Sequence, residues 1–256
     1  MLKKNLLNAL YIFFLGAISS YSLPPYNYFI INFFTFSLFF IFLFKKRKTN
    51  SNNKSFFKHG WFFGFGYFLC SLYWIAISLT FDESFKFLIP IAIVLLPAFL
   101  AIFYGLITYF FSIFYSKNII STFFIFSILY GSVEFIRGLI LTGFPWNLIA
   151  FSFSESIYFI QILSVIGTYS FNLICISLFT VPAIFILRKA RKEIIVCSFF
   201  IVISIGFLIF GNLKYNQFNT LADIKNNFII RTVSSKISLD RFYSKQDELK
   251  IIKELI

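Results

Sequence analysis

The sequence has few charged residues for its length, and this excludes a water-soluble globular fold. Of its 256 residues, 13% are charged and 59% are hydrophobic, and the mean hydropathy is +0.84. These values lie well outside the range of soluble domains. A helix that crosses about 30 Å of hydrocarbon needs roughly 20 mostly apolar residues, because its backbone groups must pair within the segment. Apolar stretches of this kind fill most of the chain, so we expect an integral membrane protein.

Residue types that commonly carry catalysis or bind metals are also scarce. The three cysteines, Cys70, Cys175 and Cys197, fall in apolar stretches without metal-ligand spacing, so we expect buried free thiols. The only histidine, His59, lies in a basic segment without an acidic neighbour, and we expect it to be solvated rather than catalytic. No glycine-rich phosphate loop and no metal motif is present. The sequence therefore predicts neither a cofactor nor a metal site.

The chain has a net charge of +13, but the distribution of this charge argues against nucleic-acid binding. A nucleic-acid interface needs a basic face on a folded soluble domain. Here the lysines and arginines instead form short clusters between apolar stretches. We therefore expect no nucleic-acid partner, and we interpret the clusters as signals of membrane topology.

Seven apolar stretches are candidate membrane-spanning helices. They are Leu6–Ser22, Phe29–Phe44, Trp61–Phe81, Phe87–Tyr115, Ile119–Val133, Ile157–Leu187 and Ile194–Gly211. The first stretch ends at Pro24 and Pro25 because proline cannot donate the backbone hydrogen bond of a continuing helix. It lacks a small-residue cleavage site, which indicates a retained anchor rather than a signal peptide. The sequence thus predicts an all-α membrane bundle of about seven helices over residues 1–211.

The positive charges indicate how this bundle is oriented. With the N-terminus inside, the inner segments hold 13 lysines and arginines, whereas the outer loops hold only Lys86 and Arg137. Because such residues concentrate on the cytoplasmic side of a membrane, the N-terminus should be cytoplasmic. Seven crossings then place the chain after Gly211 on the outer face, which is the periplasm if the cell is Gram-negative.

The sequence changes character after Gly211. Residues 212–256 are polar and contain 8 lysines and arginines, with a strand-like run at Phe228–Val233 and an amphipathic helical pattern at Gln246–Ile256. One strand and one helix cannot bury a core of their own. We therefore expect residues 212–256 to be the N-terminal edge of a second domain whose remainder is missing from this sequence.

The most informative stretch is Tyr130–Glu155, around the outer end of the fifth candidate span. Glu134 and Arg137 are three residues apart, so they share one helix face and could form an ion pair. Such a pair could serve only to lock the helix end at the membrane interface. A turn in an apolar context then breaks the helix. Its residues are Thr142, Gly143, Phe144, Pro145 and Trp146.

This turn has two interpretations from its residues alone. Glycine and proline force the chain to turn, while phenylalanine and tryptophan suit the headgroup region of a bilayer. The turn could therefore form part of a site at that depth. It could equally be an ordinary interfacial loop with an aromatic anchor.

The stretch from Glu134 to Glu155 resembles the signature of bacterial apolipoprotein N-acyltransferases. In that family a Glu-x-x-Arg-Gly helix end is followed by Leu-Thr-Gly-Phe-Pro-Trp, and the same residues stand here at 134–138 and 141–146. Three further segments fit the same family, and they are Leu23–Tyr28, Gly64–Ser78 and Gln161–Phe171. The resemblance extends over essentially all of residues 5–250.

The resemblance implies an activity, its substrates and a location. Family members transfer an acyl chain from a membrane phospholipid to the N-terminal amine of a diacylated lipoprotein cysteine. A Glu-Lys-Cys triad in a periplasmic nitrilase-like α/β domain carries the acyl group as a thioester. The membrane bundle presents both lipid substrates, which makes Glu134, Arg137 and the turn at Thr142–Trp146 the residues expected next to lipid. The implied location is the bacterial inner membrane.

The chain departs from the family pattern in its last part. Ile229–Val233 resembles the first strand of the nitrilase-like domain and Gln246–Ile256 its first helix, but no triad position is present. Ser234, Ser235 and Lys236 stand where the family tends to show Gln-Gly-Asn. The three cysteines match no triad motif. We therefore expect a truncated relative that is inactive alone, although a second polypeptide could supply the missing domain.

Two other functions remain open. A non-enzymatic lipid-binding scaffold would hold phospholipid around Thr142–Trp146 without chemistry. A small-solute transporter is the second alternative. Transport pathways usually contain ionisable side chains within the spans, and the first four candidate spans have none away from their ends.

Overall fold

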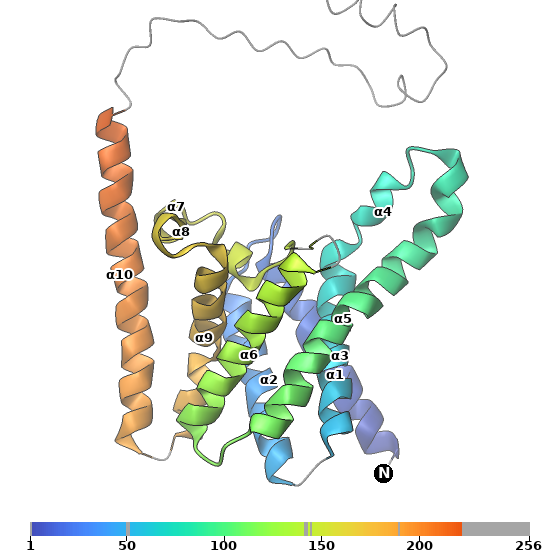
Figure 1. Cartoon of the computed structure of the whole chain (residues 1–256), viewed down its shortest axis with the longest axis horizontal. Helices are drawn as coiled ribbons and strands as arrows, with labels where there is room; N and C mark the ends of the chain where they lie inside the picture. The colour runs from blue at the N-terminus through green and yellow to red at the C-terminus, as the bar shows by residue number, and fades with distance from the viewer. Residues whose placement is uncertain (1, 50–51, 141–142, 144, 189, 222–256) are drawn as a thin grey trace, which may run out of the picture.

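The computed structural model describes residues 2–49, 52–140, 143, 145–188 and 190–221, and within them every regular element is helical (Figure 1). The long helices are α1 (Leu2–Ser19), α2 (Ile30–Lys48), α3 (Asn53–Leu72), α5 (Ile89–Phe114), α6 (Ile119–Leu139), α9 (Thr168–Leu187) and α10 (Arg191–Leu221). The short elements are η1 (Ser20–Ser22), α4 (Ile75–Ser78), η2 (Glu83–Leu88), η3 (Ile149–Phe153), α7 (Ile157–Ile160) and α8 (Leu163–Ile166). The predicted all-helical fold is thus confirmed for the described residues.

The long helices run side by side, so the bundle has two ends (Figure 1). The upper end in the figure carries α4, α7 and α8. The lower end carries the N-terminus and the connections from α2 to α3, from α5 to α6 and from α9 to α10.

Four of the described helical segments are long and apolar enough to cross a membrane, namely Glu83–Phe114, Ile119–Leu139, Thr168–Leu187 and Arg191–Thr220. The last of these segments, in α10, carries an apolar surface that is not covered by the rest of the protein. Ile195, Val202 and Ile209 on α10 leave 69%, 65% and 57% of their surface outside the protein. Such a large apolar surface is rarely exposed to water and needs lipid around it. The chain is therefore a membrane protein.

The third candidate span begins and ends earlier than the sequence predicts. The helix covers Asn53–Leu72 instead of Trp61–Phe81. Asn52 starts it by accepting a hydrogen bond on its side chain from the backbone N–H of Lys54, at 3.2 Å. The basic segment after α2 is therefore mostly helical, and only a short connection separates α2 from α3.

The early start of α3 makes the expectation of a solvated His59 wrong. His59 lies within the helix and is only 6% exposed. Its ring packs edge-on against Phe42 of α2, with the centroids 5.0 Å apart. The helical periodicity turns His59 toward α2, although it directly follows Lys58 in a basic segment.

The sixth and seventh candidate spans also differ from the structure. Gly167 has a φ of 76°, a conformation that favours glycine, and it separates α8 from α9. The chain before it forms the short turns α7 and α8, so only α9 remains of the predicted Ile157–Leu187. In contrast, α10 continues past Gly211 to Leu221. The predicted strand at Phe228–Val233 and helix at Gln246–Ile256 lie outside the described residues.

Two glycines permit α1 and α3 to pack with their backbones almost in contact. A Cβ atom on Gly66 of α3 would lie 2.1 Å from the carbonyl oxygen of Phe13 on α1. A Cβ atom on Gly16 of α1 would lie 1.9 Å from the carbonyl oxygen of Phe63 on α3. Close packing of this kind at small residues is a main source of helix association in membranes.

We expect the substitution Gly66→Ala to destabilise the bundle by roughly 1–3 kcal/mol, because the added methyl group overlaps backbone that cannot rotate away. Gly206→Ala is the matched control, since none of the residues that the structure describes would meet a Cβ atom there within 4 Å. Alanine is the better helix former, so this control should be neutral or slightly stabilising. Thermal unfolding of the detergent-purified variants measures both effects. Equal stabilities would contradict the rigid contact between α1 and α3.

Candidate functional site

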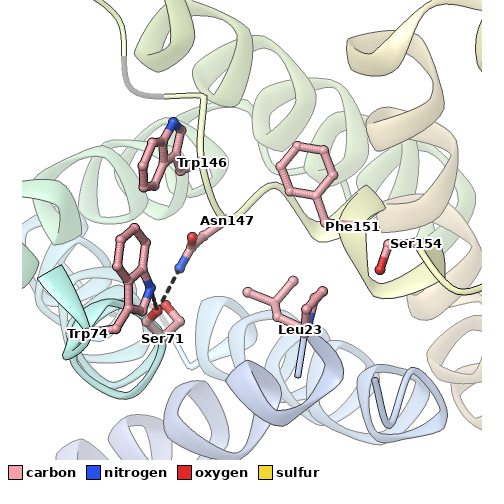
Figure 2. Close-up of a pocket in the computed structure, with 8 residues that line it drawn as sticks. Leu23, Ser71, Trp74, Trp146, Asn147, Phe151 and Ser154 are labelled. Carbon is pink, nitrogen blue, oxygen red and sulfur yellow. Dashed lines mark hydrogen bonds between the residues drawn. The ribbon is translucent and has the colours of Figure 1, made fainter. Parts of the chain in front are cut away.

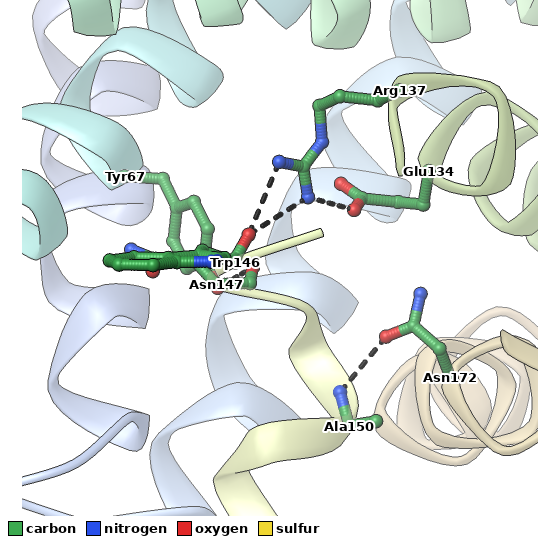
Figure 3. Close-up of polar contacts among 7 residues, drawn as sticks. All are labelled: Tyr67, Glu134, Arg137, Trp146, Asn147, Ala150 and Asn172. Atoms are coloured by element: carbon green, nitrogen blue, oxygen red, sulfur yellow. Dashed lines mark hydrogen bonds and ion pairs between the residues drawn. The ribbon is translucent and has the colours of Figure 1, made fainter. Parts of the chain in front are cut away.

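Glu134 and Arg137 form a buried ion pair near the upper end of α6. Arg137 Nη2 donates a hydrogen bond to Glu134 Oε2, and both side chains are 1% exposed (Figure 3). Their spacing places them on one helix face. The pairing expected from the sequence is therefore present, but it is buried in protein rather than placed at an interface. A buried pair of this kind leaves a costly unpaired charge when one partner is removed.

Arg137 also holds the chain that follows α6. Its Nη1 and Nη2 atoms each donate to the backbone carbonyl oxygen of Trp146, at 3.2 Å (Figure 3). The guanidinium group lies 5.3 Å from the ring centroid of Phe68 on α3. One side chain thus connects α6, α3 and the turn.

The turn itself is described in part. Gly143 has a φ of 78°, and a Cβ atom there would lie 2.6 Å from the carbonyl oxygen of Gly138. Only glycine fits this conformation without strain. Pro145 and Trp146 are exposed. Thr142 and Phe144, which the sequence also singled out, lie outside the described residues.

The segment after the turn is held by polar side chains that the sequence did not single out. The hydroxyl of Tyr67 donates to the carbonyl oxygen of Asn147 at 2.9 Å. Asn147 Nδ2 donates to the carbonyl oxygen of Ser71 at 3.3 Å. Asn172 Oδ1 accepts a hydrogen bond from the backbone N–H of Ala150 at 2.9 Å (Figure 3). The available signal was the presence of polar groups within apolar helices, since Tyr67 and Asn172 are fully buried.

Tyrosines surround the ion pair inside the bundle. Tyr67 of α3, Tyr104 of α5 and Tyr130 of α6 are buried near Glu134. The rings of Tyr104 and Tyr130 meet edge to face with centroids 4.9 Å apart. The second carboxylate oxygen of Glu134 is buried and accepts no hydrogen bond from the described residues. Arg137 is therefore the main stabiliser of the Glu134 charge.

A cavity of about 320 Å³ lies beside the turn (Figure 2), where α4 begins at the upper end of the bundle (Figure 1). The residues that line it come from three segments and are Leu23, Pro24, Ser71, Trp74, Trp146, Asn147, Phe151 and Ser154. The indole rings of Trp74 and Trp146 are stacked, with centroids 5.0 Å apart and planes inclined by 14°. Trp74 Nε1 donates to the carbonyl oxygen of Ser71 at 3.0 Å. A mostly apolar cavity with a few fixed polar groups is typical of a ligand site.

No cysteine is among the residues that line this cavity. Cys175 on α9 and Cys197 on α10 are buried free thiols, as the sequence predicted, whereas Cys70 on α3 is partly exposed. The three cysteines sit on three different helices, and none of them is paired in a disulfide. Among the residues that the structure describes, no three histidine, cysteine or acidic side chains lie close enough to hold a metal ion.

Comparison with known proteins identifies the family to which this chain belongs. The sequence model of the apolipoprotein N-acyltransferase N-terminal domain matches residues 15–181, which include the ion pair, the turn and the cavity. The chain belongs to the apolipoprotein N-acyltransferase family.

Curated members of this family are similar over most of the chain. The apolipoprotein N-acyltransferase of Rhizobium etli is 34% identical over 184 residues, which cover 69% of this chain and 34% of the relative. That of Rickettsia typhi is 34% identical over 216 residues, which cover 83% of this chain and 42% of the relative. That of Brucella melitensis is 28% identical over 256 residues, which cover 97% of this chain and 47% of the relative. The chain thus spans about a third to a half of the length of these relatives.

The segments that resemble the acyltransferase family come together in space, with one exception. Leu23–Tyr28, Gly64–Ser78 and Glu134–Glu155 all contribute to the wall of the cavity, although they lie far apart in the sequence. Gln161–Phe171 does not line it. The cavity is therefore the place where most of the family-like segments meet.

Proposed function

We propose that this chain forms the membrane part of an apolipoprotein N-acyltransferase and holds lipid substrate at the cavity beside Trp74 and Trp146. The acyl donor is a membrane phospholipid, and the acceptor is the N-terminal cysteine amine of a diacylated lipoprotein. The observation that carries this proposal is the cavity, because the family-like segments build it from both aromatic and polar groups.

The chemistry of the cavity supports a lipid rather than a small polar solute. Leu23 and Phe151 supply apolar surface for an acyl chain or a glycerol backbone. Asn147 supplies an amide next to it. Stacked indoles favour the headgroup depth of a bilayer, where an apolar ring and a polar N–H are both accommodated. Arg137 keeps Trp146 in place through the two hydrogen bonds to its carbonyl oxygen.

In this proposal the thiol that carries the acyl group lies outside residues 1–256. Cys175 and Cys197 are buried within helices. We assign residues 1–211 to the membrane domain and residues 212–256 to the N-terminal edge of a periplasmic nitrilase-like domain. The remaining part of that domain would belong to the same protein or to a separate polypeptide.

A phospholipid with a photoactivatable group in its acyl chain tests the cavity. After irradiation in vesicles, we expect crosslinked peptides that contain Trp74 or Trp146, and several-fold fewer of them in Trp146→Ala. Trp61→Ala is the matched control, because Trp61 lies on α3 away from the cavity and donates to the carbonyl oxygen of Ala98. Crosslinks spread evenly over the surface of α10 would contradict the proposal.

The same sample separates the alternatives. A lipid-binding scaffold would give these crosslinks but no acyl transfer when a nitrilase-like domain is supplied as a second polypeptide. A transporter would take up solute into sealed vesicles. The acyltransferase proposal requires crosslinking together with transfer to a diacylated lipopeptide once the domain is present.

We also propose seven crossings of the bacterial inner membrane, by α1, α2, α3, α5, α6, α9 and α10, with the N-terminus in the cytoplasm. The lower end of the bundle carries the N-terminus and three connections (Figure 1). The basic clusters at residues 45–58 and 188–192 lie mainly in the helix ends that flank two of these connections. Concentration of lysine and arginine at one end supports a cytoplasmic lower end and a periplasmic tail.

Cysteine labelling in intact cells tests this topology. A cysteine introduced at Ser244 is expected to react with a membrane-impermeant thiol reagent, whereas one at Ser51 is expected to react only after the cells are opened. The parent chain serves as the control for its own cysteines. The reverse pattern, with Ser51 labelled and Ser244 protected, would overturn the orientation.

A further inference from the structure

A second cavity, of about 500 Å³, opens at the opposite end of the bundle between α1 and α3. Asn5 and Ala9 of α1 line one side of it, and Lys54, Lys58 and Phe62 of α3 line another. Farther along the two helices, Gly16 and Gly66 bring the backbones close together. The cavity therefore lies at the N-terminal ends of α1 and α3.

The cavity is positively charged, and its own segments carry no compensating acid. Lys54 and Lys58 are four residues apart on α3, so they lie on one face of the helix. Among the described residues, neither lysine forms a salt bridge. The first acidic residue of the chain is Asp82, so α1, α2 and α3 contain no carboxylate at all. An anion that neutralises these lysines must come from elsewhere.

Further groups in the cavity favour an anion that has an apolar part. The N-terminus of α3 begins at Asn52 and presents the positive end of the helix dipole. His59 lines the cavity and is buried, and its Nδ1 atom has no hydrogen-bond partner among the described residues. Next to these polar groups, Ala9 and Phe62 provide apolar surface. A small soluble anion has no apolar part that could contact this surface.

We infer that this cavity binds the phosphate headgroup of an anionic phospholipid, with Lys54 and Lys58 as its charged partners and the lipid backbone against Ala9 and Phe62. Basic pockets between helices at the cytoplasmic face of a membrane are suited to such headgroups. The inference rests on the proposed function only for the orientation, which places this end at the cytoplasmic leaflet. The lipid is distinct from the acyl donor, because the two cavities lie at opposite ends of the bundle.

Native mass spectrometry of the full chain in detergent tests this inference, with phosphatidylglycerol as the probe. We expect the double variant Lys54→Gln/Lys58→Gln to bind it about tenfold more weakly than the parent chain. The matched control is Lys45→Gln/Lys48→Gln, which removes the same charge from the end of α2, where neither residue lines the cavity. This control is expected to bind normally. Phosphatidylcholine should bind weakly and equally to all three proteins.

A second variant covers the case in which loss of both lysines impairs folding. Ala9→Phe keeps every charge but fills the cavity, and it too should weaken phosphatidylglycerol binding. Equal losses in the two lysine variants, or undiminished binding by Ala9→Phe, would overturn the site. Inorganic phosphate that displaces the lipid at millimolar concentration would assign the cavity to a soluble anion instead. None of these results affects crosslinking at Trp146, so failure here is distinguishable from failure of the proposed function.

Discussion

A purified polypeptide of these 256 residues is expected to form no acyl thioester and to convert no diacylated lipopeptide to the triacylated form. A nucleophilic thiol needs a thiolate with a base and an oxyanion stabiliser within hydrogen-bond reach. Loss of such a set usually lowers the rate by several orders of magnitude. Cys175 and Cys197 are buried in helices, where an ionised thiolate would be strongly disfavoured. Cys70 lies on α3. Among the described residues, no hydrogen bond joins it to an acidic side chain or to a lysine.

The measurement uses the polypeptide in phospholipid vesicles with a labelled acyl donor. A hydroxylamine-sensitive adduct would report a thioester, and mass spectrometry of a synthetic lipopeptide would report transfer. The full-length Rhizobium etli relative serves as the positive control. An adduct that disappears in Cys70→Ser would contradict the prediction and would assign an unexpected nucleophile to α3.

Removal of Arg137 is expected to destabilise the bundle by about 3–5 kcal/mol, because it leaves the buried Glu134 carboxylate without its partner. The substitution Arg137→Gln also removes the donors to the carbonyl oxygen of Trp146. The double variant Glu134→Gln/Arg137→Gln leaves no buried charge at this position of α6. It should therefore lose much less stability than the sum of the two single variants, and unfolding of the detergent-solubilised proteins measures the coupling.

The chain contains a natural control for this cycle. Glu83 and Lys86 also form an ion pair with a spacing of three residues, but their side chains are 85% and 45% exposed. Solvent screens such a pair, so its coupling should stay below about 1 kcal/mol. If the losses of stability for Glu134 and Arg137 are purely additive, their coupling energy is no larger than that of the exposed pair. Such a result would show that burial does not strengthen their interaction.

The sequence was enough to predict the membrane class and the family. It also predicted the positions of most long helices and the Glu134–Arg137 pair. These features depend on short-range patterns. Apolar length decides whether a helix can span a bilayer, and a spacing of three residues decides which side chains share a helix face. The motif that follows Glu134 is also contiguous in the sequence. Such properties are local and are therefore visible without a fold.

The boundaries of α3, the burial of His59 and the cavity beside Trp74 required the tertiary structure. Asn52 starts α3 early, and the packing of α3 against α2 then decides that His59 is covered. The cavity combines three segments, and Tyr67 and Asn172 hold one of its walls from two different helices. Which residues meet in this way depends on how the helices pack together, and the spacing of residues along a single helix does not contain that information.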